Sequence, residues 1–272
     1  MIISTSKFRQ LSYQTDGSGP AVVLIHGFPE NSSLWAGVMP ILMNGFTVIM
    51  PDVPGAGDSS LPENAGMESL AEAINAILEH EGIKTALLVG HSMGGYIALA
   101  FADKYPEKLA GLSLVHSIAS ADNDEKKETR KKSVELIRKG GKEAFIKQMI
   151  PNLFSPEFRK KHPSVIEEQV KRGMELAAES MIAFTEAMMK RPDRTGLLKN
   201  AAFPVQFVLG EDDALIPVKT ALQQSSLASR NFVLLYGNTG HMSMLENPGR
   251  LAGDIKDFAS YCFTNQTIEQ SA

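Results

Sequence analysis

Short apolar runs alternate with longer segments of helical spacing over the first 116 residues. The runs are continuous and rich in β-branched residues, which is typical of strands buried on both faces of a sheet. They occupy residues 21–26, 46–50, 85–90 and 109–116. The intervening segments 34–43, 67–81 and 93–104 are predicted to be helices. An edge strand is expected at 7–15, paired as a hairpin with 1–5.

The pattern changes between residues 118 and 198, where no strand-like run occurs. Apolar residues recur there at steps of three and four, which places them on one face of a long amphipathic helix. They are Ile166, Val170, Met174, Ala177, Met181, Phe184 and Met188. Strand and helix patterns then alternate again at 203–210, 217–228, 231–236 and 248–262.

These patterns predict an α/β fold. Strands separated by single helices are joined by right-handed crossovers, so we expect a mostly parallel, twisted sheet with helices on both faces. The core domain is expected to comprise residues 1–117 and 199–272. Residues 118–198 are expected to form an inserted, all-helical cap over the sheet.

The composition narrows the class of protein. Of 272 residues, 43% are hydrophobic and 21% are charged, as in ordinary globular chains. The net charge of −4 gives no electrostatic footprint for nucleic acid, and no apolar run has the length of a membrane span. The sequence opens without the pattern of a signal peptide, and a single cysteine, Cys262, excludes an intramolecular disulfide. A cytoplasmic location is therefore expected, and both a monomer and a homodimer stay open.

The first candidate for chemistry is the pentapeptide Gly90-His91-Ser92-Met93-Gly94. It fits the pattern G-x-S-x-G between a predicted strand and a predicted helix. A sharp turn between these elements strains the backbone of the Ser, and only Gly two positions before and after it leaves room. The following helix directs its N-terminal N–H groups toward a developing oxyanion. Ser92 is therefore the predicted nucleophile.

A serine hydroxyl needs a base at neutral pH, and the base needs an acid that orients it. His241 follows the predicted strand at 231–236, and the acids Glu211, Asp212 and Asp213 follow the strand at 203–210. Ligands bind at the carboxyl ends of parallel strands, so these groups are expected at the same rim as Ser92.

A fourth element of this rim is the turn His26-Gly27-Phe28-Pro29, which follows the strand at 21–26. The N–H of Phe28, together with that of Met93, would form an oxyanion hole, in which one donor contributes about 2.7–4 kcal/mol. His26 is expected to hold its own turn by hydrogen bonding. One Cys and dispersed His residues give no metal-ligand spacing, so neither a metal nor another cofactor is expected.

Together these motifs resemble the capped, serine-dependent α/β-hydrolases. The resemblance covers nearly the whole chain except the cap, and rests on "LIHGFPENSSLW", "PDVPGAGDSS", "VGHSMGGY", "LGEDDALIP" and "GHMSMLENP" in the family's order. The family pattern G-x-x-D-x-x-[VI]-P implies Asp213 as the acid, and the family also implies Phe28 and Met93 as the oxyanion donors. Asp122 is an alternative acid, because some relatives place the acid after the earlier strand. Asp52 is expected only to shape a turn.

Sister chemistries of this fold fit the sequence less well. Epoxide hydrolases and haloalkane dehalogenases use an Asp nucleophile where Ser92 stands. Epoxide hydrolases also use tyrosines of the cap to protonate the epoxide oxygen, but residues 118–198 contain no Tyr. Dehalogenases bind the halide with a pair of Trp N–H donors, but Trp35 is the only Trp in this sequence. Hydrolases of carbon–carbon bonds usually carry Asn before the nucleophile and Trp after the base, where His91 and Met242 stand here.

The resulting hypothesis is a serine hydrolase of small, fairly apolar carboxylic esters, lactones or thioesters, with an acyl-enzyme on Ser92. A small-molecule acyl substrate is the expected partner. A carbon–carbon bond hydrolase on the same triad, and a ligand-sensing protein with slow or single turnover, are the alternatives. The residues suggested to line the pocket are His26, His116, Met174, Met181, Met188 and Met242.

Overall fold

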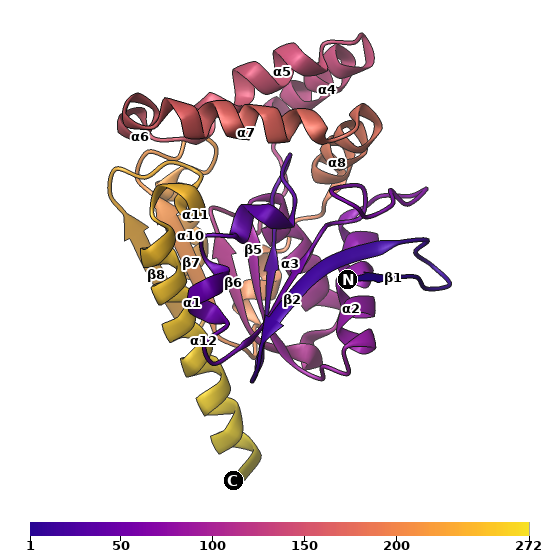
Figure 1. Cartoon of the computed structure of the whole chain (residues 1–272). Helices are drawn as coiled ribbons and strands as arrows, with labels where there is room; N and C mark the ends of the chain where they lie inside the picture. The colour runs from indigo at the N-terminus through magenta and orange to yellow at the C-terminus, as the bar shows by residue number, and fades with distance from the viewer. Residues whose placement is uncertain (272) are drawn as a thin grey trace.

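Eight strands form one sheet in the order β1-β2-β4-β3-β5-β6-β7-β8 (Figure 1). The computed structural model describes residues 1–271, and the side chains of residues 1–264. The strands are β1 (Ile2–Ile3), β2 (Leu11–Gly17), β3 (Ala21–Ile25), β4 (Thr47–Pro51), β5 (Ala86–His91), β6 (Leu109–Val115), β7 (Val205–Gly210) and β8 (Asn231–Tyr236). The pairs β1–β2 and β2–β4 are antiparallel, and β3 to β8 are parallel to one another. The predicted fold class is therefore confirmed.

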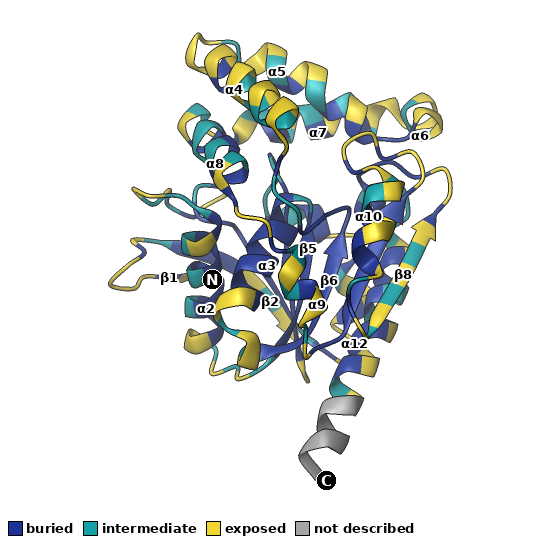
Figure 2. Cartoon of the chain, turned by 180° about the vertical axis from the view of Figure 1, so that it is seen from behind, coloured by how far each residue is buried: buried dark blue, intermediate teal, exposed yellow. Residues whose placement is uncertain are grey.

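Helices cover both faces of the sheet. On one face α2 (Met67–His80) packs on α3 (Met93–Lys104), which lies against β5 and β6. On the opposite face α1 (Met39–Leu42) packs on α12 (Pro248–Ser271), which lies against β6 (Figures 1 and 2). Every residue of β3, β5, β6 and β7 is buried, as their continuous apolar runs predict. The helix expected at 34–43 is instead a 3-10 helix at Ser32–Trp35 followed by the short α1.

The chain between β6 and β7 is helical and lies over the carboxyl ends of the strands (Figure 1). Its helices are α4 (Asp124–Arg138), α5 (Lys142–Met149), a 3-10 helix (Ile150–Leu153), α6 (Pro156–Lys161), α7 (Pro163–Glu175), α8 (Ala178–Lys190) and α9 (Thr195–Lys199). We refer to the segment from α4 to α9 as the helical segment. Its status as a separate cap domain stays a prediction.

The single long helix expected from Ile166 to Met188 is wrong. The chain leaves the helical conformation at Leu176 and Ala177, whose ψ angles are 127° and 146°. The two halves bury their apolar faces against different partners, because α7 packs on α5 whereas α8 packs on α4. A regular apolar spacing predicts which residues are buried, but it does not show that the two halves of the segment pack against different helices.

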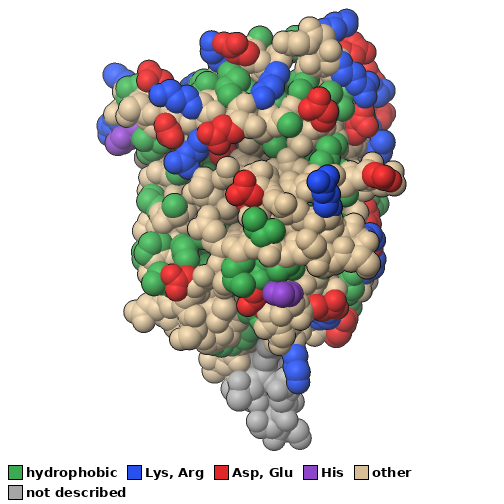
Figure 3. Space-filling model, turned by 45° about the vertical axis from the view of Figure 1, so that its right-hand side comes forward, with side chains coloured by type: hydrophobic (Ala, Val, Ile, Leu, Met, Phe, Trp, Pro, Cys, Tyr) green, Lys and Arg blue, Asp and Glu red, His purple; other side chains and the backbone are tan. Residues whose placement is uncertain are grey.

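The molecular surface is mixed in charge on the face shown in Figure 3, where acidic and basic side chains are interspersed with apolar ones. This face carries no extended basic patch of the kind that nucleic acids require. Among the helices of the described residues, none is both long and apolar enough to cross a bilayer.

Candidate active site

Ser92 occupies the turn between β5 and α3 with a strained backbone, at φ 51° and ψ −114°. A positive φ in a residue other than Gly costs about 1–3 kcal/mol and persists only where the surroundings enforce it. Here the Ser92 N–H donates to the carbonyl of Val115 at 3.0 Å, and the Ser117 hydroxyl donates to the Ser92 carbonyl at 2.8 Å. Both partners belong to the end of β6 or the residues just after it, so the neighbouring strand holds the turn.

The flanking glycines are required by close backbone contacts. A Cβ atom on Gly90 would lie 2.4 Å from the carbonyl oxygen of Gly94, and one on Gly94 would lie 2.3 Å from that of Ile25. Real Cβ atoms essentially never approach backbone atoms so closely. The spacing G-x-S-x-G therefore has a steric cause, as the sequence suggests.

Asp213 and His241 are hydrogen-bonded at the same rim. The Nδ1 atom of His241 donates to Oδ2 of Asp213 at 2.8 Å, and Oδ1 accepts from the backbone N–H groups of Leu215 (2.9 Å) and Ile216 (3.0 Å). Burial alone would raise the pKa of Asp213, but the imidazoles of His241 and His116 hold it well below its usual range. The carboxylate is thus ionised and fixed in orientation. The Nε2 atom of His241 is buried without a hydrogen-bond partner among the described residues.

A second imidazole contacts the same acid. Nδ1 of His116 lies 3.1 Å from Oδ2 of Asp213, and His116 has a positive φ of 50° at the end of β6. Burial lowers its pKa, so the ring is neutral near pH 7. A third ring, His91, bonds through Nε2 to the His241 carbonyl at 2.9 Å. Burial lowers the pKa of His91 well below its ordinary value, so it too is neutral, and it donates this bond.

The two expected oxyanion donors come after the neighbouring strands β3 and β5. Met93 is the first residue of α3, and Phe28 follows β3. Neither backbone N–H donates to another residue in the part of the chain that the structure describes. His26 holds the Phe28 turn as expected: its Nδ1 donates to the Gly27 carbonyl at 2.8 Å, and its Nε2 accepts from the Val53 N–H at 2.9 Å.

A cavity of about 220 Å³ lies beside Ser92. It is mostly apolar in lining, with residues from the core loops, α3 and the helical segment. They are Phe28, Ser92, Tyr96, Lys126, Thr129, Arg130, Ser133, Phe145, Met149, Leu153, Thr185, Met188, Leu215 and Ile216. The sequence offered a signal for three of these wall residues. Tyr96 lies one helical turn after Ser92, and Leu215 and Ile216 lie in the motif that contains Asp213. Phe145 and Met149 on α5 carry no such signal.

Only one of the six suggested lining residues, Met188, is part of this wall. His26 and His116 are engaged by hydrogen bonds to the Phe28 turn and to Asp213. Met181 and Met242 are fully buried in the core, and Met174 packs against the core from α7. Apolar spacing identified buried methionines, but not which side of the helix faces the cavity.

Asp122, the alternative acid, is engaged elsewhere. Its Oδ2 accepts from Nε of Arg130 at 2.5 Å, and its Oδ1 lies 2.8 Å from Nη1 of Arg191. The acid that contacts His241 is Asp213. Asp52 accepts hydrogen bonds from the backbone N–H groups of Ser32 and Asp58, so its role is in shaping a turn, as expected.

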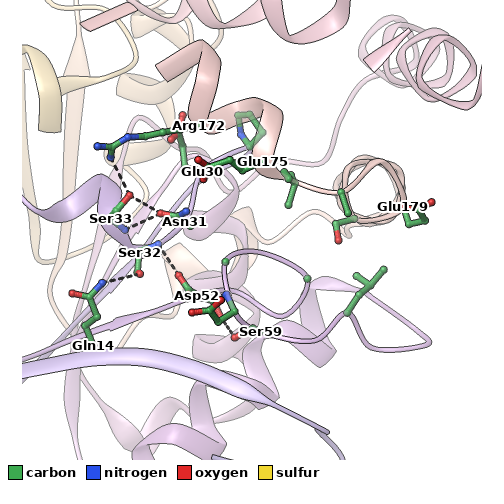
Figure 4. Close-up of a pocket in the computed structure, with 18 residues that line it drawn as sticks. Gln14, Glu30, Asn31, Ser32, Ser33, Asp52, Ser59, Arg172, Glu175 and Glu179 are labelled. Carbon is green, nitrogen blue, oxygen red and sulfur yellow. Dashed lines mark hydrogen bonds between the residues drawn. The ribbon is translucent and has the colours of Figure 1, made fainter. Parts of the chain in front are cut away.

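A second, larger cavity of about 670 Å³ lies between the Asp52 turn and the junction of α7 and α8 (Figure 4). Ser92 is not among its lining residues. Its walls carry the acids Glu30, Asp52, Asp58, Glu175 and Glu179 and the single cation Arg172. It is therefore separate from the cavity beside Ser92.

The described residues contain one close grouping of potential metal ligands, formed by His116, Asp213 and His241, whose ligand atoms lie within 4.8 Å of one another. Both imidazoles hydrogen-bond to the carboxylate within this grouping. An ion there would have to replace these two hydrogen bonds.

Known proteins share this architecture. Residues 20–139 match the family model of the alpha/beta hydrolase fold. A thermophilic esterase from Thermogutta terrifontis, solved with malate bound, is 32% identical, with a TM-score of 0.89 over 93% of this chain and 94% of that one. Lipase 1 of Psychrobacter immobilis is 27% identical over 92% of this chain and 81% of that protein. A pimeloyl-[acyl-carrier protein] methyl ester esterase of Pseudoalteromonas atlantica is 26% identical, covering 87% and 93%. This chain belongs to the α/β-hydrolase fold family.

Proposed function

We propose that this protein hydrolyses small, fairly apolar carboxylic esters through an acyl-enzyme on Ser92. The observation that carries the proposal is the hydrogen bond from His241 to the ionised Asp213, at the rim where Ser92 is held in a strained turn beside an apolar cavity. Relatives that are named esterases or lipases and match most of this chain support ester chemistry. Lactones and thioesters undergo the same acyl transfer and belong to the same proposal.

In the first half of the reaction, Nε2 of His241 takes the proton of the Ser92 hydroxyl while Oγ bonds to the substrate carbonyl carbon. The backbone N–H groups of Phe28 and Met93 stabilise the resulting oxyanion. The bond from carbon to the leaving oxygen then breaks, and His241 returns its proton to the departing alkoxide. An alcohol and an ester of Ser92 are the products of this half.

In the second half, His241 removes a proton from water, and the hydroxide attacks the acyl carbon. The bond to Ser92 Oγ breaks, His241 reprotonates Oγ, and the carboxylic acid leaves. Asp213 holds the imidazole in the tautomer that presents Nε2 and stabilises its cation. His26 and His91 act structurally in this scheme, because their ring nitrogens hold the Phe28 turn and the backbone of His241.

The helical segment serves in this proposal as a cap that closes the cavity, since four of its helices and turns contribute lining residues. It is also linked to the base, because the N–H of His241 donates to the carbonyl of Leu153 at 2.6 Å. A small-molecule acyl substrate is the proposed partner.

Fluorophosphonate labelling combined with steady-state assays on short-chain p-nitrophenyl esters tests the proposal. Wild-type protein should label at Ser92 and turn over, and Ser92→Ala should do neither. Labelling without turnover would favour the ligand-sensing alternative. Full activity in Ser92→Ala would exclude the serine mechanism. Turnover of a carbon–carbon substrate in preference to esters would favour the carbon–carbon hydrolase.

A further inference from the structure

The cavity beside Ser92 has one polar wall. Phe28, Tyr96, Phe145, Met149 and other apolar side chains surround Ser92, whereas the polar and charged wall residues other than Thr185 and Ser92 come from α4. These are Lys126, Thr129, Arg130 and Ser133, at positions i, i+3, i+4 and i+7. That spacing places all four on one face of α4, so the helix turns a cationic stripe toward an otherwise apolar site.

Lys126 supplies an unpaired positive charge. Nearby on the same helix Lys131 pairs with Glu128, but Lys126 forms no ion pair with any residue whose side chain the structure describes. The part of the chain described here contributes two cations and no acid to the wall of this cavity. Lys126 is half-buried, so an anion in the cavity would meet its ammonium group in a less polar surrounding than bulk water, where the attraction between opposite charges is stronger.

Arg130 adds to this charge. It shares the buried Asp122 with Arg191, so two guanidinium groups face one buried carboxylate. Asp193, which also lies near Arg191, is exposed and bonded to Thr195. Arg191 also donates to the carbonyls of Met188 and Ser120, and it stacks on the Tyr96 ring at 3.9 Å.

The guanidinium of Arg130 forms fewer hydrogen bonds to oxygen acceptors than that of Arg191. Beyond its bond to Asp122, its one further hydrogen bond among the described residues goes from Nη1 to the sulfur of Met188 at 3.4 Å. A thioether is a weak acceptor, so a carboxylate oxygen would be a better partner for this nitrogen. Met188 itself lines the cavity, which brings this donor to the wall.

We propose that the substrate carries a carboxylate, and that Lys126 and Arg130 bind it while the scissile carbonyl lies at Ser92. The inference rests on the proposed ester hydrolysis and names its substrate class: monoesters of small dicarboxylic acids, or small hydroxy acids that are acylated on the hydroxyl group and keep a free carboxylate. The cavity of about 220 Å³ would hold about seven waters at ~30 Å³ each. A space of this size accommodates one small molecule, so the scissile ester and the carboxylate belong to the same molecule.

Two pairs of isosteric esters test the inference. One pair carries the charge on the acyl side, as mono-4-nitrophenyl adipate against the corresponding adipamate ester. The other carries it on the leaving group, as 4-acetoxybenzoate against 4-acetoxybenzamide. In at least one pair, wild-type kcat/KM should favour the acid tenfold or more. Lys126→Gln should lower that preference, taken as the ratio of kcat/KM for the acid to kcat/KM for the amide within each variant, at least fivefold, and Lys126→Arg should restore it.

Lys127→Gln is the matched control, because it removes the same charge from the adjacent position of α4, which does not line the cavity. It should leave the preference unchanged. Equal kcat/KM for acid and amide in both pairs, or a preference that survives Lys126→Gln, would overturn the inference while the proposed ester hydrolysis stands. If wild-type protein hydrolyses none of the four esters, nor a short-chain p-nitrophenyl ester, the proposed function fails and the inference fails with it.

Discussion

His116 and His241 share one oxygen of Asp213: Nδ1 of His116 lies 3.1 Å from Oδ2, and Nδ1 of His241 lies 2.8 Å from the same atom. The acid is therefore held by a donor on the neighbouring strand as well as by the base that it orients. In the proposed mechanism His116 is therefore a positioning residue. Its ring is not part of the cavity wall; it hydrogen-bonds to Asp213, and its centroid lies 5.5 Å from that of the His241 ring.

His116→Ala should lower kcat about tenfold with little change in KM, because a hydrogen bond to a charged group contributes roughly 1.5–3 kcal/mol. His116→Asn is the matched control. Its amide nitrogen can stand where Nδ1 stands, and Asn tolerates the positive φ of this position. Steady-state kinetics should show most of the kcat retained in the Asn variant. Equal losses in the two variants would assign the effect to packing.

Asp213→Asn and Asp122→Asn should separate catalysis from stability. The first change should lower kcat by about 10⁴-fold, because an amide no longer selects the tautomer of His241 that presents Nε2. The second should leave kcat largely intact and destabilise the fold by about 3 kcal/mol, because Arg130 and Arg191 lose their buried counter-charge. Urea unfolding and ester kinetics on both variants measure the two effects. A large loss of kcat in a stable Asp122→Asn protein would revive Asp122 as the acid.

Much of the fold and of the proposed catalytic centre was predictable from sequence, because both depend on local constraints. Continuous apolar runs mark strands that are buried on both faces, and the close contacts at Gly90 and Gly94 allow no other residue there. His26 likewise acts within its own turn. Each of these features leaves a signal in a short stretch of the sequence: an apolar run, a spacing of glycines or the residues of one turn.

The features that escaped prediction depend on contacts between distant parts of the chain. The break between α7 and α8 follows from their different partners, α5 and α4. The bond from His116 to Asp213 joins two strand ends 97 residues apart. The cationic stripe on α4 lies within residues 122–132, a run of mixed charges that, as a sequence, is typical of a solvated helix face. Only the position of α4 over the cavity shows that Lys126 and Arg130 face inward.

Gly94→Ala should abolish activity and destabilise the protein, because its Cβ would lie 2.3 Å from the Ile25 carbonyl oxygen. Overpacking of this kind costs about 1–3 kcal/mol or more, and the shift would displace the turn that holds Ser92. Gly253→Ala in α12 is the control, since a Cβ at this position would have no neighbouring atom within 4 Å among the described residues, and Ala favours helix over Gly by about 1 kcal/mol. Unfolding curves and labelling of Ser92 by a fluorophosphonate measure the outcome. Normal labelling of Gly94→Ala would contradict the steric explanation.

Glu30 should make the stability of the protein depend on pH. The residue is 5% exposed at the wall of the larger cavity, its Oε1 has no partner among the described residues, and burial raises its pKa to about 7, with Arg172 opposing (Figure 4). The folded protein therefore keeps this proton to a higher pH than the unfolded chain, which releases it near 4.5. Its contribution to stability is greatest below about 4.5 and is lost as the pH rises through about 7.

Glu30→Gln should remove this dependence. At pH 8 the variant should be more stable than the wild type by up to about 3 kcal/mol, at ~1.36 kcal/mol per pKa unit, and near pH 5 the difference should shrink toward zero. Urea midpoints measured from pH 5 to pH 8 give the comparison. Glu175→Gln is the control, because this exposed acid lines the same cavity and should leave the profile of the wild type unchanged. Parallel profiles for Glu30→Gln and the wild type would show that the Glu30 carboxyl ionises as freely in the folded protein as in the unfolded chain.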